Sequence, residues 1–411
     1  MIRLGYWLGS ADVKGGGIAL YAWRILELII PHVKANKVNL VIIATSENKS
    51  SCYHLLDKYG VNAEIKILPN LNIFYKIVTK FFDFLLESFE ELNISIKWLK
   101  KIHPWSYWYE SLKIDLLHVP YQTFSSYCTS YRYSLSYPFV VTMHDLQELH
   151  YPHFFTPYQR AFRAKYFWKN IEYSSGIVVS FSHVKNDIMK YFKIPNHKID
   201  ICPLPFKSIS LTAPCSTEQK KYDQKYNSEQ GFLLYPAQTW EHKNHLSLIK
   251  SLEIILKKYN KSIKLICTGR KNSDFFPKVN SYLINSCVSN QVYFSDIIPE
   301  EELYWLYKNC TLVVIPTLYE AGSFPLLEAM FLGVPVICSS VTSLPETIKD
   351  KRFIFDPLDI EGIADLIYKM ITNQQLRQDS IINGKTRIKE LRDIDSFEYY
   401  LNLWKKVLKK M

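Results

Sequence analysis

The residues best suited to chemistry in this chain are Glu320 and Glu328, with seven residues between them in Glu320-Ala-Gly-Ser-Phe-Pro-Leu-Leu-Glu328. The apolar run over 311–316 predicts a short buried strand, and Pro325 marks the first turn of a helix. A helix that begins just after a strand offers unpaired N–H groups and a positive dipole end to a phosphate. The carboxylates would repel that phosphate unless each has another task, such as hydrogen bonding to sugar hydroxyls. Favourable placement of acids at a helix N-terminus would explain either glutamate alone, but not the whole segment.

This stretch resembles the signature of retaining nucleotide-sugar glycosyltransferases of the GT-B fold, specifically glycosyltransferase family 4 (glycosyl transferases group 1). Three later segments occur in the same order as in that family: Gly333-Val-Pro-Val-Ile337, Ser343-Leu-Pro-Glu346 and Phe355-Asp-Pro357. The resemblance implies that Glu328 binds the donor ribose and that Glu320 faces the donor sugar. It also implies that the helix start, at Gly322, Ser323 and Phe324, lies near the donor diphosphate.

A glycine-rich segment, Lys14-Gly-Gly-Gly-Ile, follows the first predicted strand and precedes a helix. Glycine lets the backbone approach a ligand closely. The spacing is not Gly-x-Gly-x-x-Gly, so it does not indicate a dinucleotide site. The resemblance places Gly16 and Gly17 near the donor diphosphate and the acceptor, and the alternative is a tight strand-to-helix turn.

A polar pair, His144 and Asp145, ends the apolar run that starts at Phe139. A histidine there can donate to a sugar hydroxyl or to developing charge, and a carboxylate can orient it. The resembled family has a His-Asp pair at this point, with the histidine on the donor sugar. Four other histidines are interpreted as packing or surface residues, and no spacing suggests a metal site: His118, His150, His153 and His183.

Lys243, in Tyr235-Pro-Ala-Gln-Thr-Trp-Glu-His-Lys243, supplies a compact positive charge for a diphosphate. The resembled family usually has an arginine several residues earlier, where this chain has Gln238 or Trp240. Arg270 could supply the missing charge, and a surface role for it is as plausible. No convincing Asp-x-Asp metal-binding pair is present, so we expect no metal and no cofactor.

Alternating apolar runs and helical segments predict parallel α/β layers, arranged as two Rossmann-like doubly wound domains facing across a cleft. We expect an acceptor-side domain over 1–207, a linker over the polar stretch 208–230, and a nucleotide-sugar-binding domain over 231–390. A helix over 391–411 is expected to pack back on the first domain. Strands are predicted at 2–8, 38–44, 116–119, 139–143, 176–180, 233–236, 263–268, 292–294, 312–315 and 334–338.

The length of 411 residues indicates two domains, and 48% apolar with 22% charged residues indicates a globular protein. The eight cysteines are scattered singly, which fits a reduced cytosolic compartment. The first residues lack signal-peptide features, and no apolar stretch approaches the ~20 residues that span a bilayer. We therefore expect a cytoplasmic protein, either soluble or peripheral on the inner face of the membrane.

The net charge of +11 suits a phosphate-bearing donor and an anionic membrane surface, although solubility alone would explain it equally well. No zinc finger, RNP-like motif or Arg-rich arm is present, which argues against nucleic acid as a partner. The segment 71–109 carries many aromatic residues and lysines, which can rest at a bilayer interface. We favour helices that cover the first sheet, because Asp83, Glu87, Glu90 and Glu91 dilute the positive charge.

The resemblance implies transfer of a sugar, with mannose from GDP-mannose as the first choice, to a growing surface polysaccharide or lipid-linked oligosaccharide. A nucleotide-sugar epimerase of the same fold would instead turn over donor without acceptor. A non-catalytic relative would usually have lost a phosphate-binding cation or a sugar-facing acid, whereas Lys243, His144, Glu320 and Glu328 are all present.

Overall fold

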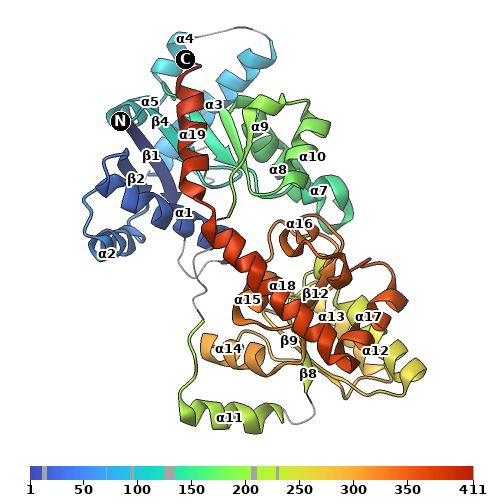
Figure 1. The fold of residues 1–411 in the computed structure, drawn as a ribbon. Coiled ribbons are helices and arrows are strands. Elements are labelled where there is room, and N and C mark those ends of the chain that lie inside the picture. Colours follow the sequence, from blue (N-terminus) through green and yellow to red (C-terminus); the bar gives the residue numbers. More distant parts are fainter. Residues whose placement is uncertain are drawn as a thin grey trace. The chain divides into compact units, whose positions relative to one another are not determined.

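The computed structural model describes residues 1–11, 16–70, 72–92, 94, 97–124, 135–204, 211–227 and 231–410. The chain divides into two compact units (Figure 1). The first consists of Met1–Pro205 together with Asp395–Met411, and the second consists of Phe206–Ile394. Each unit is built on one parallel sheet.

The sheet of the first unit has seven strands in the order β3-β2-β1-β4-β5-β6-β7. The strand order reverses between β1 and β4, and in doubly wound folds ligands bind beyond the carboxyl ends of strands at such a switch point. The strands are β1 (Ile2–Gly9), β2 (Val38–Ala44), β3 (Glu64–Ile67), β4 (Leu116–Val119), β5 (Phe139–Thr142), β6 (Gly176–Val179) and β7 (Ile199–Ile201).

Both faces of this sheet are buried, which explains why its central strands are almost continuously apolar. Leu4 and Tyr6 of β1 belong to one hydrophobic cluster, while Trp7 belongs to a second cluster. The helices of the unit are α1 (Gly16–Lys34), α2 (Lys49–Tyr59), α3 (Ile73–Glu91), α4 (Lys97–Lys101), α5 (Ser106–Ser111), α7 (Gln147–His150), α8 (Pro157–Arg163), α9 (Lys169–Tyr173), α10 (Ser182–Phe192) and α19 (Ser396–Leu408). Short turns complete it: the 3-10 helices η1 (Pro152–Phe154) and η3 (Asn196–Lys198), and the π-helical η2 (Ala164–Trp168).

The last helix, α19, is part of the core of the first unit. The Trp404 indole donates to Nδ1 of His118 at 3.2 Å, and the hydroxyls of Tyr400 and Tyr21 lie 2.8 Å apart. A Cβ at Gly176 would lie 2.9 Å from the side chain of Val407, so this glycine permits α19 to lie directly on β6.

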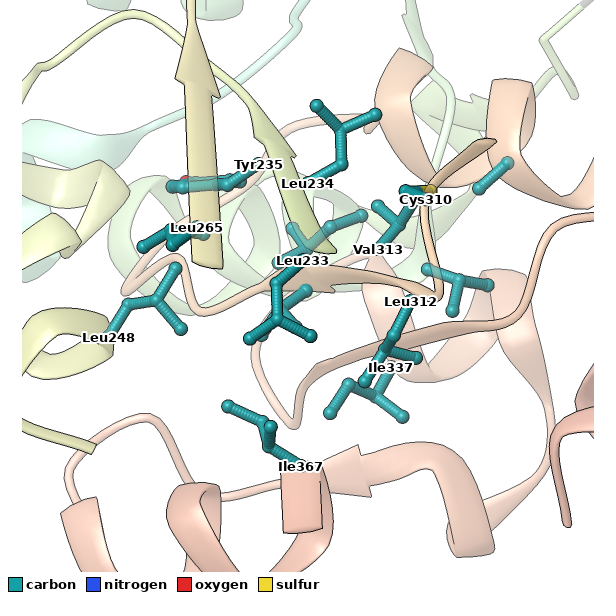
Figure 2. Packing of buried hydrophobic residues seen from close by; sticks show 14 of the residues in the cluster. Leu233, Leu234, Tyr235, Leu248, Leu265, Cys310, Leu312, Val313, Ile337 and Ile367 are labelled. Carbon is teal, nitrogen blue, oxygen red and sulfur yellow. The ribbon is translucent and has the colours of Figure 1, made fainter. Parts of the chain in front are cut away.

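The second unit has a six-stranded sheet in the order β10-β9-β8-β11-β12-β13, with its switch point between β8 and β11. Its strands are β8 (Phe232–Pro236), β9 (Lys264–Thr268), β10 (Val292–Phe294), β11 (Leu312–Ile315), β12 (Val336–Ser339) and β13 (Ile354–Phe355). Aliphatic side chains of the central strands form its core, as Figure 2 shows around Leu233, Leu265 and Val313.

The helices of the second unit are α11 (Ser216–Tyr226), α12 (His245–Tyr259), α13 (Phe276–Ile284), α14 (Glu300–Asn309), α15 (Phe324–Leu332), α16 (Leu344–Ile348), α17 (Ile360–Thr372) and α18 (Gln374–Asp393). Two 3-10 turns, η5 (Glu241–Lys243) and η6 (Lys351–Phe353), accompany them. Helix α11 falls within the polar stretch expected to be a linker. Its Tyr222 and Tyr226 are buried in the core of the unit, where Tyr226 stacks on Trp305 and the Tyr222 ring contacts Trp305 at a tilt.

Candidate functional site

The switch point of the second unit brings Lys243 and Glu320 together. Lys243 ends the short turn after β8, Glu320 follows β11, and these two strands are hydrogen-bonded neighbours. The Lys243 ammonium donates to a carboxylate oxygen of Glu320 at 2.6 Å, and the two side chains are only 19% and 12% exposed. The sequence singles out these two residues separately, and the structure joins them into one ion pair.

The loop that carries Lys243 is fixed by the residue after it. Asn244 adopts a left-handed backbone conformation (φ 59°), and its buried amide donates to the carbonyls of Pro316 and Pro357 at 2.9 and 3.0 Å. The Tyr235 hydroxyl donates to the Lys243 carbonyl at 2.8 Å. The Lys243 backbone is therefore tied to β8 and to the segment that follows β11.

Glu320 is held through its backbone, which leaves its carboxylate to be placed by Lys243. Its N–H donates to the Thr342 hydroxyl at 2.9 Å. Its carbonyl accepts from the hydroxyls of Thr342 and Ser343 at 2.7 and 2.9 Å. The segment Ser343-Leu-Pro-Glu346 therefore supports the loop that carries Glu320.

Helix α15 begins two residues beyond Gly322, with Ser323 as its N-cap. The Ser323 hydroxyl accepts from the Leu326 N–H at 3.4 Å, and Pro325 stands in the first turn, where it needs no N–H donor. The helix ends at Gly333 (φ 68°), a left-handed cap. The positive end of its dipole thus lies at Gly322, Ser323 and Phe324, as a phosphate-binding site requires.

Glu328 lies on α15 and is paired with a tyrosine from α14. The Tyr307 hydroxyl donates to its carboxylate at 2.7 Å. Burial raises the pKa of the Glu328 carboxyl above its usual range, and the Tyr307 hydrogen bond opposes that rise. The hydrogen bond orients one carboxylate oxygen, and no motif in the sequence pointed to Tyr307.

Gln238 and Arg270 lie at the same sheet edge, but within the described residues neither of them contacts Lys243 or Glu320 through a hydrogen bond or an ion pair. Gln238 is exposed and accepts from the Trp240 indole at 3.0 Å, while the Arg270 carbonyl accepts from the Thr239 N–H at 3.1 Å. Gly269, at φ 107°, lets the two loops meet, because a Cβ there would lie 2.9 Å from the backbone of Ala237 and Gln238.

In the first unit, His144 is held by its ring nitrogen Nε2, which lies 3.0 Å from the Pro120 carbonyl. Because a carbonyl only accepts, Nε2 carries the proton of this hydrogen bond. Burial lowers the pKa of His144, so the ring is neutral near pH 7 and Nδ1 is an acceptor. From the sequence we expect this histidine to donate a hydrogen bond to a sugar hydroxyl. In the structure, Nδ1 is instead able to accept a hydrogen bond from a hydroxyl. The Tyr21 ring of α1 contacts the His144 ring edge-on, with 4.7 Å between the ring centroids.

Asp145 is bound to Arg163, 18 residues further along the chain. The same guanidinium donates through Nε to buried Glu148 at 2.8 Å. It lies 4.9 Å from the ring centroids of both Phe155 and Phe167. Arg163 is a positioning residue that the sequence analysis missed, since nothing in the motif around His144 points to it.

Gly16 and Gly17 begin α1, directly before Ile18 in the wall of a cavity of about 380 Å³. This cavity lies beyond the carboxyl ends of β1 and β4, and large apolar groups line much of it: Trp7, Ile18, Tyr121, Phe124 and Phe167. Residues 12–15, which include Lys14 and Gly15 of the glycine-rich segment, lie outside the described residues.

No cluster of three or more His, Cys, Asp or Glu side chains suited to a metal ion occurs within the ranges that the structure describes. Across the same ranges, every helix is too short or too polar to cross a bilayer.

Comparison with known families matches residues 216–387 to the glycosyl transferases group 1. The O-antigen chain mannosyltransferase B of Escherichia coli is 25% identical over 61% of this chain and 66% of its own length. The O-antigen chain mannosyltransferase RfbU of Salmonella typhimurium is 24% identical over 53% of this chain and 57% of its own. The matched part therefore spans less than two thirds of either relative.

Among solved structures, Anabaena Alr3699/HepE in complex with UDP and glucose matches 100% of both chains, with a TM-score of 0.67 and 14% sequence identity. At that identity the likeness concerns the fold alone. It confirms the predicted fold class of two Rossmann-like parallel α/β domains, and the family match confirms the resemblance drawn from the sequence.

Proposed function

We propose that this chain, whose residues 216–387 belong to the glycosyl transferases group 1, transfers a sugar from a nucleoside diphosphate donor to an acceptor hydroxyl and retains the anomeric configuration. The observation that carries the proposal is the shielded Lys243–Glu320 pair at the switch point of the second unit. A cation and a carboxylate side by side suit a ligand that has a diphosphate at one end and sugar hydroxyls at the other.

The donor diphosphate is proposed to bind at the start of α15, where Ser323 and Phe324 present the positive end of the helix. Lys243 adds a full charge there, and it turns from the Glu320 carboxylate toward the phosphate oxygens when the donor enters. Arg270 and Gln238 are proposed as peripheral donor contacts, because both follow strands at the same sheet edge.

Glu328 is proposed to bind the donor ribose. Tyr307 occupies one carboxylate oxygen, so hydroxyl groups of the ribose would bind to the other. Burial strengthens these hydrogen bonds by removing competing water.

In the transfer step, the bond between the anomeric carbon and the diphosphate oxygen breaks, and a bond from the acceptor oxygen to the same carbon forms. The acceptor proton passes to the departing phosphate oxygen. Lys243 and the α15 N-terminus stabilise the charge that develops on the diphosphate, which is greater in the transition state than in the bound donor.

Further residues are proposed to bind the sugar and the acceptor. Glu320 would accept from donor sugar hydroxyls, and His144 would accept from a hydroxyl through Nδ1 while Asp145 fixes the turn that carries it. Gly16 and Gly17 would let the backbone at the start of α1 approach the donor diphosphate and the acceptor closely.

GDP-mannose is our first choice of donor, and the similarity to two O-antigen mannosyltransferases supports mannose. The proposed acceptor is a growing surface polysaccharide or a lipid-linked oligosaccharide. We propose that the enzyme is cytoplasmic and reaches this acceptor at the inner face of the membrane. We propose that neither a metal nor a cofactor takes part, because Lys243 and the helix N-terminus provide the positive charge.

A panel of UDP-, GDP- and dTDP-sugars tests the proposal by thermal stabilisation and nucleotide release. We expect one donor to stabilise the protein, with release stimulated by a lipid-linked saccharide and unaffected by a chelator. Lys243→Ala should remove the donor-induced stabilisation, while the ligand-free variant, which leaves the shielded Glu320 carboxylate without Lys243, should melt at a lower temperature but remain folded. Donor converted to another sugar nucleotide without acceptor would indicate an epimerase. No response to any donor from the folded protein would contradict the proposal.

A further inference from the structure

A row of exposed apolar side chains without a partner among the described residues covers one face of α3. Five large apolar residues of this helix are between 58% and 78% exposed: Ile73, Phe74, Ile77, Phe81 and Phe84. At about 100° per residue they fall within a sector of roughly 100° on the helix surface. Three phenylalanines at about 60% exposure leave on the order of 100 Å² each in water. The row therefore matches the largest patches that monomeric proteins expose, which are often functional.

The opposite face of α3 is already packed. Its Leu86, Phe82 and Phe89 form a small hydrophobic cluster with Leu99 of α4, and the clusters on the first sheet do not include them. The helix is therefore apolar on two faces, and only one of them has a partner among the described residues. The sequence interpretation that the helices of 71–109 cover the sheet holds at α5, where Trp105 and Tyr109 pack on it, but not for the exposed row of α3.

Lys80 is exposed next to the row, about 20° from Ile73 on the helix surface. Asp83 is 14% exposed and lies 3.5 Å from His103, and Glu87 is paired with Lys165 at 3.3 Å. These two acids of α3 each face a basic side chain, and the side chains of Glu90 and Glu91 lie outside the described part.

We propose that the α3 row inserts its apolar side chains into the headgroup region of a membrane that contains anionic lipids, while Lys80 contacts a lipid phosphate. Phenylalanines beside a lysine on a helix surface fit such an interface. A symmetric contact between two copies would place Lys80 beside the row on both copies. The inference deepens the proposed function, since a lipid-linked acceptor would be met on that membrane.

The test measures binding of the full chain to sedimented phosphatidylcholine vesicles with and without phosphatidylglycerol, in the absence of any sugar donor. We expect binding that requires phosphatidylglycerol and weakens with salt. Ile77→Ser with Phe81→Ser and Phe84→Ser should reduce binding at least about tenfold. Lys80→Gln should reduce it about fivefold.

A matched control replaces two equally exposed isoleucines of the second unit, Ile284→Ser with Ile297→Ser, which are 67% and 66% exposed, and should bind vesicles like the unchanged protein. The triple variant should keep its donor-induced thermal stabilisation, so loss of vesicle binding is separable from failure of the proposed transferase function. Equal binding by the triple variant, or no binding by the unchanged protein, would overturn the inference. A dimer that the triple variant abolishes, with no vesicle binding, would instead assign the row to self-association.

Discussion

The two units hold their candidate residues by different means. In the second unit, Lys243 and Glu320 stand on short loops that leave neighbouring strands, and side chain-to-backbone hydrogen bonds fix those loops. In the first unit, the His144–Asp145 turn depends on the Arg163 guanidinium from a later helix. The site of the second unit is thus determined largely by local backbone conformation, and that of the first by a buried network of charges.

The largest effect we expect comes from Glu320→Gln in the second unit. Removing the carboxylate charge while keeping the shape should lower kcat by about 100- to 1,000-fold, the usual loss for one electrostatic contact to a transition state. Donor affinity should stay the same or rise, because Lys243 loses its internal partner. Kinetics of nucleotide release and calorimetric donor binding measure the two quantities separately. Glu361→Gln, an exposed acid on α17, is the control. A parallel loss of affinity and kcat would contradict the role of Glu320.

Arg163→Ala tests the charge network of the first unit. The substitution leaves Glu148 buried and unpaired by Arg163, so we expect the free energy of unfolding to fall by about 3–5 kcal/mol. Arg163→Lys should recover only part of this, because an ammonium cannot donate in the forked geometry that serves Asp145 and Glu148. Arg160→Ala, on the exposed side of the same helix, should change stability by less than about 0.5 kcal/mol. Denaturant unfolding measures the stability of each variant. Equal midpoints for the two alanine variants would show that the charge network does not stabilise the folded protein.

Asn244→Ala tests whether local hydrogen bonds to the backbone stabilise the loops that carry the candidate site of the second unit. Asn244 and Asn260 of this unit both have left-handed backbones: Asn244 (φ 59°) donates to two carbonyls, and Asn260 (φ 48°) is an exposed helix cap. Alanine is strained by the left-handed backbone at both positions. Only at position 244 does the substitution also remove hydrogen bonds to Pro316 and Pro357. We expect Asn244→Ala to be more destabilising by about 2 kcal/mol, near 1 kcal/mol per hydrogen bond. The same loss at both positions would mean that the two hydrogen bonds add no stability.

Much of the fold was predictable from the sequence because central parallel strands are continuously apolar. All ten predicted strands exist, with ends within two residues of those expected. The three that were missed lie at sheet edges. β3 (Glu64–Ile67) alternates charged and apolar residues and is only half-buried, while β7 and β13 have three and two residues. Edge strands of this kind leave no apolar run to detect.

The candidate site was predictable only one residue at a time. Motifs identified Lys243 and Glu320, but their contact depends on β8 and β11 being neighbours, which the order of the sheet determines. Tyr307 and Arg163 carried no signal, because each meets its carboxylate through tertiary packing across 21 and 18 residues. The sequence also did not show whether the row on α3 is exposed, since the pattern of apolar residues is the same whether one or both faces of a helix are covered.

The smallest expected effect concerns Glu328 and appears only as a pH dependence. Burial raises the pKa of this carboxyl in the folded protein above its ordinary value of 4.5. Between the two pKa values the folded state holds a proton that the unfolded state has lost, so Glu328 contributes less stability as pH rises through that window. Glu328→Gln keeps an acceptor for the Tyr307 hydroxyl but cannot ionise. We therefore expect the variant to gain stability relative to the unchanged protein as pH rises from the ordinary carboxyl range toward neutrality, as measured by denaturant unfolding at several pH values. A constant difference between the two proteins across that range would show that Tyr307 fully offsets the burial of the carboxylate.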